Sequence, residues 1–247
     1  YSLWDDYNTN VNLEYSPMRM RYKNTGNKEY DKNKHLFTSS LVNNKRKIME
    51  VLNSGAAGVR LPVSSKTYNK LAQIAVALAD NESQMGTSRR YKWKMDDRMR
   101  DESFIESINS LLGKATSRGL TQIKMSKDNE ELQKLYKTFG LSEDNVADNP
   151  EKSAMATMLR LIYTFNNETG GNFYDNKGNK MDRTDVLLYK YIGQGYKLAK
   201  TSEEGKALGK EKDGDGYAKG ANPAQNTYIK LLKNNQKKTT IETWMEE

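Results

Sequence analysis

The strongest constraint on the fold is an apolar stripe at helical spacing in the first half of the chain. Its members recur three or four positions apart, at Tyr68, Leu71, Ala72, Ala75, Leu78 and Ala79. This spacing places them on one face of an α-helix, which Ser64 or Ser65 can cap at its start. Alternating patterns typical of strands are weaker throughout the chain. The sequence therefore predicts a mainly α fold.

Further helices are predicted wherever the same period returns between turn signals, at residues 38–52, 101–112, 129–138, 150–166, 183–198 and 224–235. The segment before them is polar and aromatic without a sustained period, which predicts an irregular N-terminal arm at 1–37. A chain of 247 residues is long enough for one large domain. We expect that domain at 38–235 and a C-terminal tail at 236–247.

The residue types limit the chemistry that this chain can perform. Cysteine is absent and histidine occurs once, at His35, which we expect on the surface of the arm. Disulfides, thiolate nucleophiles and zinc sites built from several imidazoles are therefore excluded. We expect no metal and no cofactor, and any hydrolytic chemistry should depend on carboxylates.

The charge balance predicts attraction to a polyanion. The formal net charge is +8, and nucleic acid, an anionic membrane surface and the bacterial cell wall would all attract it. Lysine outnumbers arginine, which argues against base-specific recognition, and no nucleic-acid-binding module is recognisable. No apolar run approaches the roughly 18 to 20 residues that a membrane span needs.

Glu82 is the candidate catalytic residue. It lies four residues after Leu78 and seven after Ala75, which puts it on the buried stripe at the end of the predicted helix. A carboxylate in that position is either paired structurally or placed for chemistry. Glycoside cleavage needs a proton donor, and partial burial favours the protonated form of a carboxyl group.

A recognisable pattern surrounds Glu82. An apolar helix ending in Glu82-Ser83, followed by Gly119-Leu-Thr-Gln-Ile123, resembles the signature of soluble lytic transglycosylases and goose-type lysozymes. The resemblance implies a lysozyme-like α-helical domain in which Glu82 is the general acid. It also implies that Gly119, Gln122 and Ile123 line the substrate cleft, with Ser117 as the serine that bonds the acid.

Later segments follow the order of the same family. Asp148-Asn-Pro150 resembles its Asp-Pro element, the segment from Leu188 to Gly193 stands in place of its Ala-Tyr-Asn-x-Gly, and Asn222 to Ile229 resembles its terminal helix. Tyr191 is the implied substrate-binding tyrosine, with Tyr189 competing for that role. The pattern departs from the family at Thr121, where methionine is usual, and in the missing asparagine after the tyrosine.

The resemblance implies cleavage of the β-1,4 bond between N-acetylmuramic acid and N-acetylglucosamine. Transglycosylation would need Glu82 alone. Hydrolysis with inversion would need a second carboxylate about 6.5 to 9.5 Å away. The obvious suppliers are Asp96, Asp97 and Asp101, in a segment at 84–115 that is expected to form one wall of the cleft.

The expected partner is the glycan strand of peptidoglycan, and the expected site of action is the bacterial cell wall or periplasm. Lysine and asparagine richness suggests a bacteriophage lysin or a virion-associated enzyme, with other virion or machine components as further partners. Two alternatives come from other classes. One is a noncatalytic wall-binding or structural virion module with a lysozyme-like fold, and the other is a nucleic-acid-binding protein.

Overall fold

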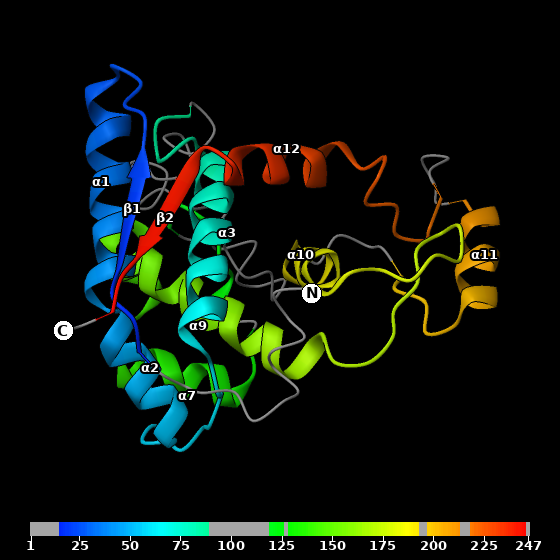
Figure 1. Ribbon diagram of the computed structural model, residues 1–247, viewed down its shortest axis with the longest axis horizontal. Coiled ribbons are helices and arrows are strands. Elements are labelled where there is room, and N and C mark those ends of the chain that lie inside the picture. Colours follow the sequence, from blue (N-terminus) through cyan, green and yellow to red (C-terminus); the bar gives the residue numbers. More distant parts are fainter. Residues whose placement is uncertain (1–14, 89–118, 126–127, 193–196, 213–217, 246–247) are drawn as a thin grey trace, which may run out of the picture. The chain divides into compact units, whose positions relative to one another are not determined.

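The computed structural model describes residues 15–88, 119–125, 128–192, 197–212 and 218–245 (Figure 1). In these ranges the chain forms nine helices and a single two-stranded sheet, which confirms the mainly α prediction. The chain divides into two compact units. One contains residues up to Ile162 together with those from Asn235, and the other runs from Tyr163 to Asn234.

The first unit is built on five complete helices and the start of a sixth. They are α1 (Lys28–Asn43), α2 (Lys45–Ser54), α3 (Ser65–Ser83), α7 (Glu130–Thr138), α8 (Glu143–Ala147) and α9 (Pro150–Glu168), and α9 ends in the second unit. Helix α3 is the most buried of them and matches the predicted apolar stripe. Ser64 caps it by accepting the backbone N–H of Thr67.

Helices α1 and α3 lie side by side and run in opposite directions (Figure 1). At one end the Tyr68 hydroxyl donates to the Leu41 carbonyl at 2.7 Å. Near the other end the Asn33 side chain donates to the Met85 carbonyl at 2.8 Å. The predicted helix at 38–52 is in fact two helices, because Asn44 has φ −93° and ψ −2° between α1 and α2.

The sheet joins the two ends of the described chain. Strand β1 (Met18–Tyr22) pairs antiparallel with β2 (Thr239–Thr243). The predicted irregular arm therefore holds a strand and the first part of α1, and the predicted tail holds the partner strand. Each strand has only five residues, and its partner is distant in sequence. A local period could not reveal the pair.

The second unit contains α10 (Arg183–Ile192), α11 (Ser202–Lys210) and most of α12 (Thr227–Gln236). Helix α10 was predicted to reach Leu198 but ends at Ile192. Residue 197 instead lies in an isolated bridge with Gly220. Several short bridges of this kind tie the loops of this unit together.

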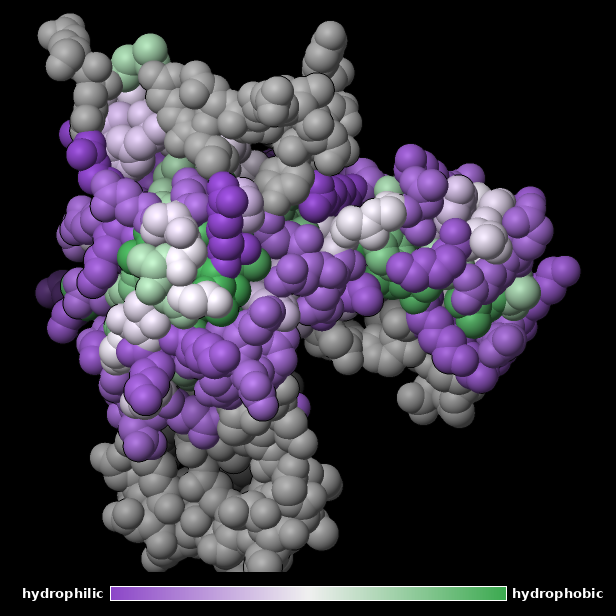
Figure 2. Space-filling model, turned by 90° about the horizontal axis from the view of Figure 1, so that it is seen from below, coloured by the Kyte–Doolittle hydropathy of each residue, from purple (hydrophilic) through white to green (hydrophobic). Residues whose placement is uncertain are grey.

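The surface is strongly polar, in keeping with the charge. The face shown in Figure 2 is mostly hydrophilic, with small apolar patches between polar side chains. Of the large hydrophobic side chains in the described ranges, Leu231, Trp244 and Met245 are exposed. No described helix combines the length and the apolar character needed to cross a membrane.

Candidate active site at the end of α3

Glu82 lies in the last turn of α3 and is half-buried. The helix before it is almost wholly buried, since the side chains from Ile74 to Ala79 are at most 1% exposed. The sequence thus places Glu82 where the buried stripe reaches the surface, as predicted. In this position the carboxyl group of Glu82 can contact a ligand, while the backbone of the residue is fixed by the buried helix.

The chain leaves α3 after Ser83 through a tight turn. Gln84 and Met85 both have φ near +50°, and Gly86 continues with φ +82°. Two successive non-glycine residues in the left-handed region are uncommon and costly. Ser83 holds the turn, because its hydroxyl donates to the Ala79 carbonyl and accepts the Gly86 N–H, both at 3.0 Å.

A buried polar cluster lies on the α1 side of this turn. The Tyr30 hydroxyl donates to the Asp80 carboxylate, and the Lys34 ammonium lies 3.5 Å from the same carboxylate. Lys34 also lies 5.2 Å from the centre of the Tyr22 ring. Burial, followed by the bond to Asp80, raises the pKa of Tyr30 well above its usual range, so the phenol stays protonated as a donor.

Asn81 is held from another direction. Its side-chain carbonyl accepts a hydrogen bond from the Asn235 amide, at the end of α12. Asp80, Asn81 and Met85 therefore all form hydrogen bonds with neighbouring elements. Glu82 lies among them in the sequence. Asp80, Lys34 and Tyr30 were not among the predicted site residues. An acidic residue beside Glu82 within an apolar helix was the available signal.

The segment from Gly119 to Ile123 is the second predicted part of the site. Gly119 has φ +69°, and a Cβ atom there would lie 2.7 Å from the Ser153 hydroxyl and 2.9 Å from Val146. The Ser153 hydroxyl accepts the Leu120 N–H at 2.9 Å. Only glycine fits this close approach, because it has no side chain. The backbone of Gly119 therefore packs directly against the start of α9.

Thr121 continues the docking of this segment on α9. The hydroxyls of Thr121 and Thr157 are 2.6 Å apart, and Thr157 donates to the Ser153 carbonyl. Thr121 must therefore donate to Thr157, since each hydroxyl has one proton. This buried bond explains a threonine where the resembled family has methionine.

Gln122 is half-buried and has φ +55°. Its side-chain amide donates to the Gly119 carbonyl at 2.9 Å, which closes the turn on itself. Ile123 is only 1% exposed and belongs to the core.

The remaining predicted residues fall in other places. Ser117, the carboxylates Asp96, Asp97 and Asp101, and most of the predicted cleft wall lie outside the described residues. Tyr191 lies in α10 of the second unit and is 8% exposed. In the same helix, the Tyr189 hydroxyl accepts the Asn222 N–H at 3.0 Å, so Tyr189 has a structural role.

The described residues contain no group of three or more side chains suited to hold a metal ion. What the site offers is one half-buried carboxyl group on a rigid helix end, beside a strained turn. His35, by contrast, is exposed on α1, in a regular helix instead of an irregular arm. Comparison with protein-family models, with curated proteins and with solved structures gave no match to this chain.

Proposed function

We propose that this protein is a peptidoglycan-cleaving muramidase with a lysozyme-like fold, and that Glu82 is its general acid. The bond cleaved is the β-1,4 link between N-acetylmuramic acid and N-acetylglucosamine. The proposal joins the resemblance carried by Glu82-Ser83 and Gly119 to Ile123 with the geometry at the end of α3.

One observation carries the proposal. In the described residues only Gln84, Met85 and Gln122 are non-glycine residues with positive φ. Gln122 lies within the segment Gly119 to Ile123, and Gln84 and Met85 directly follow Glu82-Ser83. Such conformations cost about 1 kcal/mol or more each and concentrate at functional sites. This coincidence favours a functional role for both turns.

The chemistry assigned to Glu82 is proton delivery to the glycosidic oxygen. Asp80 cannot serve as a second carboxylate, because Tyr30 and Lys34 hold it in the buried cluster. A mechanism with one carboxylate, in which Glu82 later accepts the proton of the sugar's own 6-hydroxyl, needs no further acid. We therefore favour lytic transglycosylation over hydrolysis.

Gln122 is assigned a substrate hydrogen bond, while Gly119 lets its backbone lie against α9. The substrate contacts expected of Ser117, Ile123 and Tyr191 stay predictions. We place the activity at the bacterial cell wall or periplasm, with peptidoglycan glycan strands as partner. A lysin or virion-associated enzyme of a bacteriophage fits the strongly basic composition.

The test is digestion of purified peptidoglycan sacculi by the parent and by Glu82→Gln, with the products identified by mass spectrometry. The amide keeps the shape and lacks the proton, so solubilisation should fall at least ~100-fold. Glu50→Gln, on the exposed face of α2, is the matched control and should retain full activity. Products with 1,6-anhydro ends would support transglycosylation, and reducing ends would support hydrolysis.

The same experiment separates the noncatalytic alternative. A chain that sediments with sacculi but releases no muropeptides would be a wall-binding module. Activity of Glu82→Gln within severalfold of the parent would remove Glu82 from the mechanism.

A further inference from the structure

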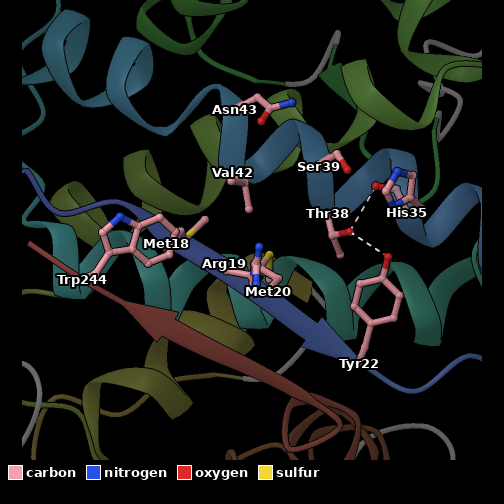
Figure 3. A pocket seen from close by; sticks show the side chains of 10 residues that line it. All are labelled: Met18, Arg19, Met20, Tyr22, His35, Thr38, Ser39, Val42, Asn43 and Trp244. Carbon is pink, nitrogen blue, oxygen red and sulfur yellow. Dashed lines mark hydrogen bonds between the residues drawn. The ribbon is translucent and has the colours of Figure 1, made fainter. Parts of the chain in front are cut away.

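A groove lies between β1 and α1 (Figure 3). It holds about 310 Å³ and is open to solvent. Strand β1 lines one wall and the row His35, Ser39, Val42 and Asn43 of α1 lines the other. Trp244, which is 49% exposed, lies at one end beside Met18.

The hydrogen-bond register of the sheet shows which edge of β1 faces away from β2. The Trp244 N–H donates to the Pro17 carbonyl at 3.4 Å, so these two residues form a hydrogen-bonded pair. In an antiparallel ladder such pairs alternate. Arg19 and Arg21 therefore bond to Glu242 and Thr240, their partners in the register.

The backbone N–H and C=O groups of Met18, Met20 and Tyr22 consequently point to the opposite edge. None of them has a hydrogen-bond partner in the described part of the chain. These three residues also line the groove. An unpaired strand edge bordered by a groove is the arrangement that binds an extended peptide by strand addition.

The charges of the groove indicate the kind of peptide. Arg19 lines the groove and is exposed, and it makes no ion pair with another described residue. The neighbouring Arg21, by contrast, is paired with Glu242 at 2.8 Å. His35, Ser39 and Asn43 add polar groups, and no acidic side chain lines the groove. Apolar surface comes from Met18, Met20, Tyr22, Val42 and Trp244.

We propose that this groove binds an extended acidic peptide segment of a partner protein, which adds a third strand to the sheet at the free edge of β1. Arg19 contacts an acidic side chain of the peptide, and the apolar surface takes the alternate residues. The inference is independent of the proposed muramidase activity, since the groove contains none of the residues assigned to that site.

The test uses the full chain and a capped peptide of about six residues that alternates glutamate with valine, long enough to span β1. Binding is followed by NMR, through the backbone amides of the protein, and by calorimetry. The peptide should shift and protect the amides of Met18, Met20 and Tyr22, while those of Arg19 and Arg21 stay protected by β2. A lysine-valine peptide should bind at least about tenfold more weakly, since one charge-assisted contact is lost.

Two variants and one modified peptide test separate parts of the proposal. Arg19→Glu should weaken the acidic peptide at least about tenfold and favour the lysine peptide, whereas Lys137→Glu, exposed on α7, should change little. Met20→Pro removes a free-edge N–H without breaking a ladder bond. A peptide N-methylated at alternate amides removes the reciprocal bonds, from the peptide N–H groups to the free-edge carbonyls of β1, without altering the protein; each of the two changes should weaken binding.

Several results would overturn the inference. One is the absence of amide shifts with the acidic peptide at millimolar concentration. Another is binding that survives both alternate N-methylation and Arg19→Glu. A third is protection of these amides by a second copy of the chain, or by chito-oligosaccharide, in place of peptide. Each of these outcomes leaves the Glu82 assignment untouched.

Discussion

The hydroxyl of Tyr30 donates to the carboxylate of Asp80, two residues before Glu82 on α3. Lys34 completes the contact, with its ammonium 3.3 Å from the Tyr30 oxygen and 3.5 Å from the Asp80 carboxylate. The Lys34 and Asp80 side chains are only 4% and 8% exposed. This cluster therefore fixes α1 against the end of α3 that bears Glu82.

We predict that Lys34→Met destabilises the protein by roughly 3 kcal/mol or more, because it leaves the Asp80 charge buried without its partner. The double variant Lys34→Met/Asp80→Asn should be more stable than the sum of the two single variants indicates. Chemical denaturation of the four proteins measures both effects. Lys32→Met, on the exposed side of α1, is the control, and an equal loss there would contradict the prediction.

Gly119→Ala should destabilise the protein and reduce any lytic activity. The new methyl would meet Ser153 and Val146 at 2.7 and 2.9 Å, at a residue with φ +69°. Gly140→Ala is a matched control, because Gly140 has φ +66° but no atom within 4 Å of an added Cβ. The control carries only the backbone cost, about 1 kcal/mol. Thermal unfolding should therefore show the larger loss for Gly119→Ala, and equal losses would refute the packing argument.

Much of the helical framework could be predicted from local patterns. The start of α3 was predicted at Ser64 or Ser65, and α7 and α9 were predicted close to their observed bounds, at residues 129–138 and 150–166. These helices carry strong apolar periods or polar caps. Asn129, for example, caps α7 by accepting the Leu132 N–H. Local signals of this kind act within a few residues and can be read from the chain alone.

The features that sequence reasoning missed depend on partners distant in the chain. Met18 pairs with Thr243 across almost the whole sequence, and Asp80 meets Lys34 only because α1 and α3 are antiparallel. The half-buried position of Glu82 followed from its helical phase. Nothing local could show that Thr121 bonds to Thr157 on α9, because that contact needs the tertiary fold.

Lys45 should make the stability of the protein depend on alkaline pH. It is fully buried in α2, donates to the Ser16 carbonyl and lies near the Tyr15 and Tyr68 rings. Burial lowers the pKa of Lys45 from 10.5 to about 8. Between these values the unfolded chain binds a proton that the folded protein lacks, so stability rises with pH.

The measurement for Lys45 is the free energy of unfolding of the parent and of Lys45→Met from about pH 7 to pH 10. The parent should gain stability relative to the variant as pH rises through 8. Lys47→Met, on the exposed side of α2, should show no such relative trend. If the difference in free energy of unfolding between the parent and Lys45→Met does not change with pH, Lys45 is hydrated in the folded state.

The last prediction concerns Asp185 of α10, in the second unit. Its carboxylate lies 2.6 Å from the Lys233 ammonium, and the side chain is 9% exposed. Burial raises the pKa of Asp185 from 3.8 to about 6, although the bond to Lys233 opposes the shift and Asp182 adds to it. Because the pKa of Asp185 is higher in the folded state than in the unfolded state, the folded protein keeps the proton up to a higher pH. The stability from this group is complete below pH 3.8 and is lost as pH rises through about 6.

Asp185→Asn cannot titrate, so the stability of the parent relative to this variant should fall by roughly 2 to 3 kcal/mol across that window. Unfolding by urea at pH 4, 5, 6 and 7, followed by circular dichroism, measures the difference, with the exposed Asp144→Asn as control. A relative stability that instead increases with pH would show that the ion pair with Lys233 outweighs burial and keeps Asp185 ionised.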